Sequence, residues 1–320
     1  MPENRMTIGV DVGGTKVAAG LVDASGAISA KTRVPMNASG DATAGFAAVR
    51  QAIDAVLAAA PQAAGAVTGI GICAPGPLDP FAGVVLNPPN VPCWRNYPLA
   101  EETARAFCVL ARVDNDANAA GLAEVLWGAG AGYKYVFYGT LGTGIGTGFV
   151  FDRRIYHGRT GSAAEGGHVT IDYNGPVCGC GKRGCVEILC SGPAIAARAR
   201  ARLGASGSSS RIAALAGGDW ERVRAEHVGQ AYREGDPEAT AVLQETGRLL
   251  AIWLGNMIDT LDPDVMVIGG GVAELMSSFF DQILADIPAW AINPRANEVP
   301  LVMARYGADA GIAGAAALCF

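Results

Sequence analysis

The amino-acid sequence predicts an α/β fold of two domains that face each other across a cleft. The chain has 320 residues, half of them hydrophobic, which is too many for one small core and suits two domains of ordinary size. A buried strand, a glycine-rich turn and a further strand follow one another at residues 6–22 and again at 135–151. This repeat of architecture indicates two similarly folded halves.

The charge balance argues against several classes of partner. The net charge is −6 and the isoelectric point is near 5.2, which disfavours nucleic acid and anionic membranes as general partners. No stretch approaches the roughly 20 apolar residues of a membrane helix, and the first residues lack the apolar core of a signal peptide. We therefore expect a cytoplasmic protein whose eight cysteines are thiols or metal ligands.

The first glycine-rich turn joins a strand at residues 6–12 to a strand at 17–22, and a third short strand follows. Because this turn does not open a helix, it is neither the dinucleotide fingerprint nor the Walker loop. An ordinary hairpin turn is one reading and a phosphate-binding turn is the other. The groups suited to phosphate, or to a metal ion carried by phosphate, are Gly13, Gly14, Thr15, Lys16 and, at the strand end, Asp11.

A helix at 44–59, a strand at 67–73 and a strand at 83–86 are predicted next. The loop N-P-P-N-V-P-C-W then contains too much proline for a helix or a central strand. Asn87 and Asn90 are therefore held on a rigid loop, which suits either a polar ligand or a plain turn.

The strand at 109–113 ends at the sequence D-N-D, and a helix is predicted from about residue 117 to 127. Asp116 lies where the strand meets the helix. On this motif alone we favour a helix N-cap, the commonest role of aspartate at such a place, over catalysis. Asp116 can serve both roles only if its carboxylate faces a cleft.

The second half of the chain begins with a strand at 135–141 and a turn, G-T-G-I-G-T-G, that leads into a strand at 149–151. The remaining elements are predicted as helices near 192–203, 209–216, 221–233 and 237–261, a strand at 265–268, a triple glycine at 269–271, a helix from about 273, a strand at 301–304 and a final helix at 310–318. The triple glycine lets the backbone pass close to a flat ligand or to phosphate.

The most specific local pattern lies between Glu165 and Glu187, where cysteines spaced C-x-C-x4-C follow a histidine. Three thiolates and one imidazole form a four-ligand set that closes around Zn²⁺ and leaves no open position for a reacting water. The predicted ligands are His168, Cys178, Cys180 and Cys185. The alternative is a glycine-rich loop with incidental cysteines.

Taken together, the motifs D-V-G-G-T-K, N-D-A-N-A-A-G-L-A-E, L-G-T-G-I-G-T-G, E-G-G-H…C-x-C-G-x-x-G-C-V-E and V-I-G-G-G resemble, in this order, those of the ROK family. That family includes bacterial sugar kinases, among them bacterial-type glucokinases, and sugar-responsive repressors. The resemblance implies a two-domain actin-like ATPase (ribonuclease H-like) fold with an interdomain cleft. We expect a small α/β domain of residues 1–116 with about 306–320, and a larger domain of 117–305 that carries the zinc loop.

The resemblance also implies a role for each matched residue. Asp116 matches the catalytic base. Residues that match sugar-hydroxyl contacts are Asn90, Asn115, Glu165, His168 and Glu187. Residues that match the phosphate-binding turns are Gly13, Gly14, Thr15 and Lys16 with Thr143 and Gly144, and those beside the adenosine are Gly270 and Gly271. One departure is Gly166, where many members carry a bulky apolar residue, and we expect its small size to loosen the packing behind Glu165.

The expected activity is ATP-dependent phosphorylation of the 6-hydroxyl of glucose, with Mg²⁺, a structural Zn²⁺ and a homodimer or homotetramer. Fructose, mannose, N-acetylmannosamine and N-acetylglucosamine remain alternative sugars, and polyphosphate remains an alternative donor. A sugar-sensing regulator is disfavoured by the acidic isoelectric point and by the few residues that precede the first strand. A zinc-ribbon interaction protein would leave both glycine turns and Asp116 without a role.

Overall fold

A computed structural model describes residues 5–206 and 210–320, and their contacts divide the chain into two compact units. The first unit comprises Met1–Tyr138, Gly148–Ala164 and Ala304–Phe320, and the second comprises Gly139–Thr147 and Glu165–Met303. The domain boundary expected at residue 116 stays a prediction. Among the described helices, none has both the length and the apolar character that crossing a membrane requires.

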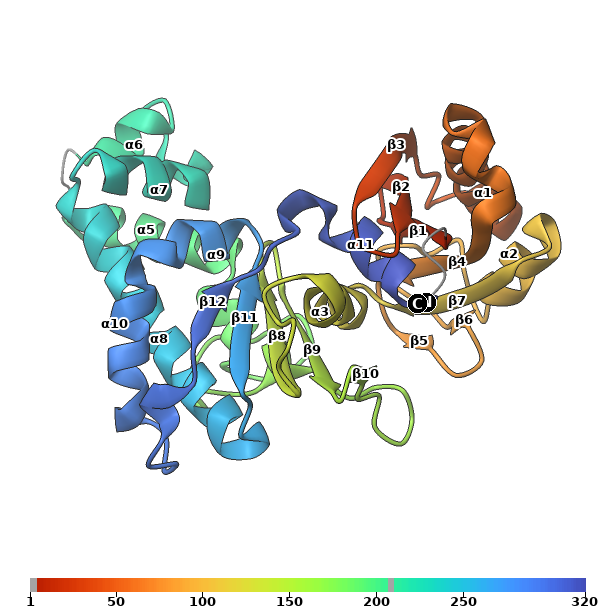
Figure 1. Ribbon diagram of the computed structural model, residues 1–320. Coiled ribbons are helices and arrows are strands. Elements are labelled where there is room, and N and C mark those ends of the chain that lie inside the picture. The colour runs from red at the N-terminus through yellow and green to blue at the C-terminus, as the bar shows by residue number, and fades with distance from the viewer. Residues whose placement is uncertain (1–4, 207–209) are drawn as a thin grey trace. The chain divides into compact units, whose positions relative to one another are not determined.

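The first unit is built on a five-stranded sheet whose order is β3-β2-β1-β4-β7 (Figure 1). Strands β1, β2 and β3 form an antiparallel meander, whereas β4 pairs parallel with β1 and β7 pairs parallel with β4. The strands are β1 (Met6–Val12), β2 (Lys16–Asp23), β3 (Ile28–Pro35), β4 (Val67–Ala74) and β7 (Leu110–Asn115).

A second five-stranded sheet has the order β10-β9-β8-β11-β12. Its strands are β8 (Tyr135–Leu141), β9 (Ile145–Phe151), β10 (Arg154–Ile155), β11 (Val265–Gly269) and β12 (Leu301–Met303). In both sheets the first strand in the sequence lies at the centre, with the second and third strands on one side and the later two on the other. The predicted repeat of architecture is therefore present.

The helices agree with the predicted ones in the long segments and differ in the short ones. Those of the first unit are α1 (Ala42–Ala59), α2 (Leu99–Phe107), α3 (Asp116–Trp127) and α11 (Ala310–Ala317), with a small hairpin of β5 (Leu78–Asp79) and β6 (Val84–Val85). Those of the second unit are α4 (Val186–Cys190), α5 (Gly192–Ser206), α6 (Arg211–Leu215), α7 (Ala225–Arg233), α8 (Pro237–Leu261), α9 (Gly271–Met276) and α10 (Phe280–Asp286). Helices α2, α4 and α10 were not predicted, and β9 begins four residues earlier than expected, so the second turn is only Gly142–Gly144.

Alternate residues of β1 and β2 pack against helices on opposite faces of the first sheet, as the period of two in a strand requires. Ile8 and Val10 belong to the main core, which includes Val49 and Ile53 of α1. On the other face, Ala18 and Val22 of β2 pack against Ile312 and Ala316 of α11.

Helix α11 lies unusually close to the sheet because glycine occupies the contact positions on both sides. A Cβ atom at Gly9 would overlap the backbone oxygen of Ile312, and one at Gly71 would overlap that of Ala315. A Cβ atom at Gly314 would lie 2.6 Å from the backbone of α3. The Ala- and Gly-rich composition of α11 thus permits its close packing on the sheet and on α3.

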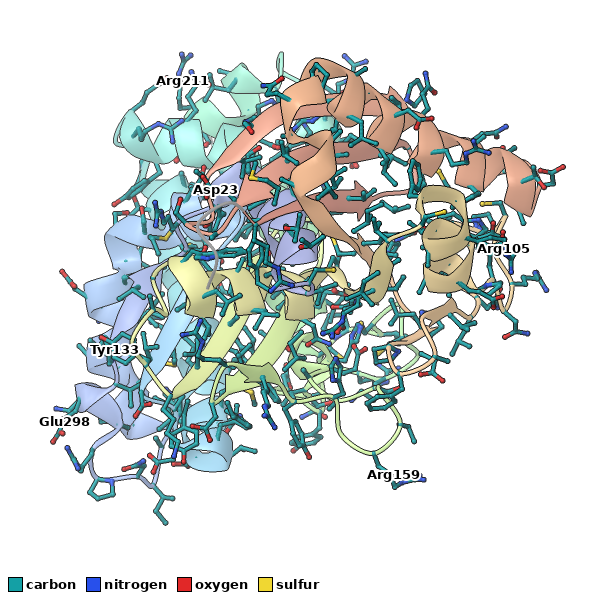
Figure 2. All side chains as sticks on the ribbon, turned by 45° about the vertical axis from the view of Figure 1, so that its right-hand side comes forward. Asp23, Arg105, Tyr133, Arg159, Arg211 and Glu298 are labelled. Carbon is teal, nitrogen blue, oxygen red and sulfur yellow. The ribbon has the colours of Figure 1, made fainter. Side chains whose placement is uncertain are left out.

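Charged side chains cover the outer faces of the helices, where Arg105, Arg211 and Glu298 are labelled in Figure 2. Arg105 contacts Glu101 at 2.5 Å and Glu102 at 2.6 Å on exposed α2. Exposed pairs of this kind contribute at most about 1 kcal/mol each, so the packing of the sheets and helices determines the fold.

We expect the replacement Gly71→Ala to destabilise the protein by about 3 kcal/mol, the upper end of the usual cost of overpacking, because the added methyl meets backbone atoms of α11 that no side-chain rotation can move. Gly65→Ala is the matched control, since nothing lies near the added methyl there. Urea unfolding measures both variants, and equal midpoints would contradict the close packing of α11.

Candidate active site and cysteine cluster

The first glycine turn and the proline-rich loop come together in the first unit. The Gly13 amide donates a hydrogen bond to the Lys16 carbonyl at 2.9 Å, which closes the turn between β1 and β2. A Cβ atom at Gly14 would lie 2.6 Å from the backbone oxygen of Asn90. The loop that carries Asn90 therefore packs directly on the turn, and Gly14 is the residue that permits this approach.

Asp11 lies at the end of β1, next to the N-terminal turn of α11. The Cys73 thiol lies 3.5 Å from its Oδ1 atom, and a Cβ atom at Gly311 would overlap its carboxyl group. Burial raises the pKa of Asp11 above its ordinary value, although the Cys73 contact and the Lys16 charge oppose this. The geometry leaves Asp11 available as a carboxylate ligand beside the glycine turn.

The N-cap of α3 is Asn115 and not Asp116, which corrects the preferred reading of the D-N-D motif. The Asn115 Oδ1 atom accepts hydrogen bonds from the backbone amides of Ala117 and Asn118 at 2.9 and 3.3 Å. The carboxamide oxygen of Asn115 is used by the cap, and the Asn115 side chain also hydrogen-bonds to the Asp116 carboxylate. Asp116 is the first helical residue, and its Oδ1 atom contacts the Ala117 amide at 2.8 Å.

The Asp116 side chain is exposed to solvent, and the surrounding protein atoms nevertheless desolvate its carboxylate in part. Desolvation, with a further contribution from the negative charge of Asp11, raises the pKa of Asp116 to about 6. The hydrogen bond from Ala117 opposes this rise. A carboxyl group with such a pKa is still ionised at neutral pH and accepts a proton more readily than an ordinary aspartate, which suits a general base.

In the second unit, the ends of β8 and β11 meet at a cavity of about 800 Å³. Gly142 and Thr143 line it from the turn after β8, and Gly271 lines it from the N-terminus of α9. Gly270 has a φ of 91°, and a Cβ atom there would overlap Leu141, so the triple glycine allows the two strand ends to approach. The N-terminus of α5 also borders the cavity. The arginines that line the cavity are Arg200, Arg224 and Arg233.

Glu187 connects the second glycine turn to the cysteine segment. Its Oε2 atom accepts a hydrogen bond from the Ile145 amide at 2.9 Å, and a Cβ atom at Gly144 would lie 2.6 Å from the same oxygen. Its Oε1 atom lies 4.0 Å from Nδ1 of His168, on the short turn Gly166–His168. The structure thus brings Gly144, Glu187 and His168 together, whereas Glu165 is exposed and precedes this turn.

The four predicted metal ligands form one cluster. The ligand atoms of His168, Cys178, Cys180 and Cys185 all lie within 4.8 Å of one another. Nδ1 of His168 is 3.7 Å from the Cys178 sulfur, and the sulfurs of Cys180 and Cys185 are 3.6 Å apart. Tetrahedral bonds of about 2.3 Å to Zn²⁺ separate two sulfur ligands by about 3.8 Å, so the donor set fits this ion. Nδ1 is the ring nitrogen that faces the cysteines.

The packing around Gly166 is tight, so the expectation of loose packing at this position is wrong. The Gly166 amide donates to Oγ1 of Thr147 at 2.9 Å, and its carbonyl accepts from the indole of buried Trp253 at 3.0 Å. A Cβ atom at Gly166 would lie 2.7 Å from Oγ1 of Thr147. The side chain of Thr147 therefore fills the space that a larger residue at 166 would need.

Sequence reasoning missed His157, which lies 2.6 Å from the Asp114 carboxylate behind the start of α3. The stretch Y-H-G-R around it matches no catalytic or metal motif. It was one of only three histidines, and its rarity was the one signal that pointed to it.

The raised pKa of Asp116 predicts a stability effect of known sign. The pKa of Asp116 is about 6 in the folded state and about 4 in the unfolded state, so the folded state holds the proton more tightly. As the pH rises through this range, ionisation of Asp116 therefore lowers the free energy of unfolding. Asp116→Asn should therefore raise the melting temperature at pH 7.5 and leave it nearly unchanged at pH 4.

Asp236→Ala provides the control of opposite sign, because hydrogen bonds lower the pKa of Asp236 despite its burial. This variant should lose stability above pH 4. A melting shift for Asp116→Asn that is the same at both pH values would contradict the raised pKa.

Comparison with known proteins places the chain among its relatives. The model described as "ROK family" matches residues 7–320. A glucokinase of Streptomyces coelicolor is 33% identical over 317 residues, with 98% of this chain and 97% of the relative covered. An N-acetylmannosamine kinase of Escherichia fergusonii is 35% identical over 314 residues, with 98% and 97% covered.

Among solved structures, a ROK family glucokinase from Streptomyces griseus, in complex with glucose and AMPPNP, is 35% identical. It superposes with a TM-score of 0.77, and 98% of each chain is covered. The similarity of fold over the full length confirms the expected two-domain actin-like ATPase fold. Because the family model and the relatives all match across nearly the whole sequence, this chain belongs to the ROK family.

Proposed function

We propose that this sugar kinase transfers the γ-phosphoryl group of ATP to the 6-hydroxyl of glucose. The observation that carries this proposal is the solvent-accessible Asp116 at the start of α3, whose pKa is raised to about 6. Phosphoryl transfer asks the protein for positioning, charge stabilisation and a base at the nucleophile. The similarity to curated glucokinases supports glucose as the substrate.

In this proposal Asp116 accepts the proton of the attacking sugar hydroxyl. A hydroxyl is a poor nucleophile at neutral pH, and a carboxylate within hydrogen-bond reach overcomes this limit. The carboxamide NH2 group of Asn115 has two N–H donors and donates one to a sugar oxygen beside Asp116, and Asn90 does the same from the rigid loop beside Gly14. These fixed polar groups select a ligand that pairs with all of them.

Glu165, His168 and Glu187 provide further sugar contacts in the proposed site. If Nδ1 of His168 binds Zn²⁺, as its distance to Cys178 supports, Nε2 carries the proton and donates to a sugar hydroxyl. Zinc bound by Cys178, Cys180 and Cys185 would then hold the ring and its tautomer in place. A closed four-ligand set gives the metal a structural function.

The nucleotide binds, we propose, in the cavity of the second unit. Thr143 and Gly144 hold phosphate oxygens, and Gly270 and Gly271 pass close to the adenosine. In the first unit, the phosphate contacts are assigned to the turn Gly13–Lys16. Mg²⁺ carried by the nucleotide would neutralise phosphate charge, and Asp11 is the carboxylate suited to face it. The glucokinase of S. griseus, which was solved with AMPPNP, supports ATP as the donor.

A second candidate substrate is N-acetylmannosamine, because a kinase for this sugar is 35% identical to the chain. The two sugars differ at carbon 2, and small changes in the contacts around this position decide between them. Both candidates use the same base and the same donor, so one experiment separates them.

We expect ADP release that depends on both sugar and Mg²⁺, with glucose the best of a panel of hexoses and N-acetylhexosamines. Asp116→Ala should lower kcat by about 10²- to 10⁴-fold through loss of the base, and the wild-type rate should fall below about pH 6 as Asp116 becomes protonated. A coupled assay with ATP, and in parallel with polyphosphate, measures this.

Asp54→Ala, an exposed replacement on α1, is the control and should retain full activity. Full activity of Asp116→Ala would refute the assignment of the base. A preference for N-acetylmannosamine over glucose would keep the kinase and change its substrate.

We expect about one equivalent of zinc in the purified protein by elemental analysis. Cys180→Ser removes one of four ligands and should lose most of this metal, whereas Cys108→Ser, an exposed cysteine outside the cluster, should retain it. Less than about half an equivalent in well-folded wild-type protein would count against a structural zinc site.

A further inference from the structure

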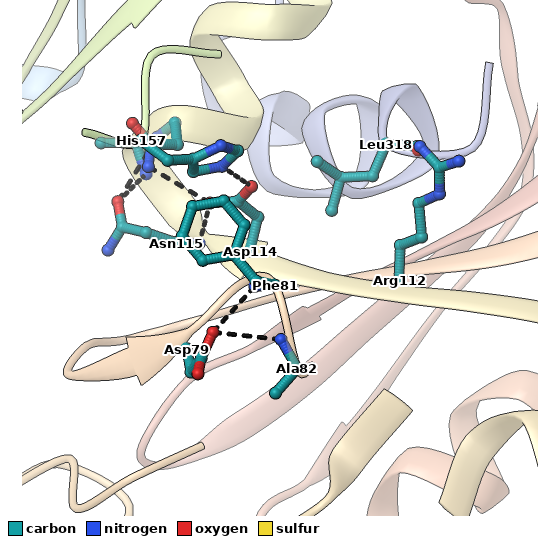
Figure 3. A network of polar contacts seen from close by, with 10 residues as sticks. Asp79, Phe81, Ala82, Arg112, Asp114, Asn115, His157 and Leu318 are labelled. Atoms are coloured by element: carbon teal, nitrogen blue, oxygen red, sulfur yellow. Dashed lines mark hydrogen bonds and ion pairs between the residues drawn. The ribbon is translucent and has the colours of Figure 1, made fainter. Parts of the chain in front are cut away.

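Behind the start of α3, the carboxylate of Asp114 is the centre of a polar network that the proposed reaction does not use (Figure 3). Asp114 is only 4% exposed. Its Oδ1 atom accepts from the Asn115 amide at 2.7 Å and from Nδ2 of Asn118 at 3.2 Å. Its Oδ2 atom lies 2.6 Å from Nε2 of His157. A buried carboxylate needs such donors, and three groups supply them.

The direction of the His157 contact follows from the chemistry of its partner. An ionised carboxylate only accepts hydrogen bonds, so Nε2 of His157 carries the hydrogen and donates the hydrogen bond. The contact is therefore a hydrogen bond to a charged acceptor, which is stronger than one between neutral groups.

The chain around His157 is fixed by contacts on several sides. The Tyr156 amide donates to the Phe149 carbonyl at 2.7 Å, and the Ala163 amide donates to the His157 carbonyl at 3.2 Å. The ring of Phe81 meets the imidazole edge-on at 5.5 Å between centroids. A Cβ atom at Gly161 would lie 2.5 Å from Pro80, so the loop between residues 156 and 163 packs on the segment that carries Phe81.

We propose that His157 is a positioning residue for the kinase reaction, which acts through Asp114 to hold the first turn of α3 and thereby orients Asn115 and Asp116. His157 hydrogen-bonds to the Asp114 carboxylate, which accepts a hydrogen bond from the backbone amide of Asn115. The Asn115 side chain in turn caps the backbone amides of Ala117 and Asn118. The peptide that precedes Asn115 and the two peptides that follow Asp116 are thus fixed by groups that His157 supports. The effect on catalysis rests on the function proposed above.

Three replacements separate the hydrogen bond from the packing of the ring. His157→Phe keeps the aromatic contact with Phe81 and removes the donor. His157→Gln restores an N–H donor at a similar reach. Phe81→Leu removes the ring contact and leaves the hydrogen bond in place.

For His157→Phe we expect kcat to fall about tenfold or more and the KM for sugar to rise, because loss of a hydrogen bond to a charged group lets Asn115 and Asp116 move. The KM for ATP should change less than the KM for sugar, since neither the cavity of the second unit nor the turn Gly13–Lys16 contains a residue of this network. His157→Gln and Phe81→Leu should stay within about threefold of the wild-type kcat.

Three results would overturn the proposal: wild-type kinetics for His157→Phe, equal impairment of His157→Gln and His157→Phe, or equal impairment of Phe81→Leu and His157→Phe. If His157→Phe does not fold, His157→Asn takes its place, because its shorter amide does not reach Asp114.

Hydrogen exchange of the amides of residues 117–119 tests the positioning without any turnover. We expect these amides to exchange about tenfold faster in His157→Phe than in the wild type or Phe81→Leu, with the amides of α1 unchanged as an internal reference. Unchanged exchange in His157→Phe would refute the positioning role. If wild-type protein phosphorylates no sugar, the kinase proposal fails, and the exchange comparison still decides whether His157 holds α3.

Discussion

The close approach of α11 to the first sheet is the constraint on which the proposed catalytic residues depend. Gly9 and Gly71 on the strands let the backbone of α11 settle against the sheet, and Gly314 on the helix admits α3. With any larger residue at these places, α11 would have to move outward. Asp11 and the start of α3 would move with it, since Gly311 touches the Asp11 carboxyl group. The glycines of a buried helix interface thus fix the positions of exposed functional groups.

Asp114 and Asp116 are two residues apart, yet the structure treats their carboxylates in opposite ways. Asp114 is buried and receives three hydrogen bonds, so its charge serves to hold the backbone around it. Asp116 accepts a hydrogen bond from the Ala117 amide, keeps solvent access and has a pKa near 6. Desolvation raises the pKa of Asp116 although hydrogen bonds oppose the rise, so this carboxylate accepts a proton more readily than an ordinary aspartate. The same strand end therefore provides both an anchor for the backbone and the carboxylate that we propose as the base.

In the second unit, the cysteine cluster includes His168, a residue that we also propose as a sugar contact. Its four ligand atoms lie close enough to share one ion, and Nδ1 of His168 belongs to this group. Glu187, whose Oε1 atom lies 4.0 Å from the same Nδ1 atom, is fixed by the Ile145 amide. Tight packing of Gly166 between Thr147 and Trp253 holds the same segment from behind. The short 3-10 turn Gly166–His168 is in this way held by contacts with the cysteines, Thr147 and Trp253.

The sequence by itself determined the α/β class, the long helices and central strands, the two glycine turns and the four members of the cysteine cluster. These features depend on local periodicity and on residue types at fixed spacing, which a sequence displays directly. It did not determine the helix cap, since Asn115 and Asp116 are both good caps and only the backbone path selects one of them. It also gave no sign of the tight packing at Gly166 or of the pairing of His157 with Asp114, which are 43 residues apart. Such contacts are decided by tertiary structure, because they join segments whose approach depends on how sheets and helices pack.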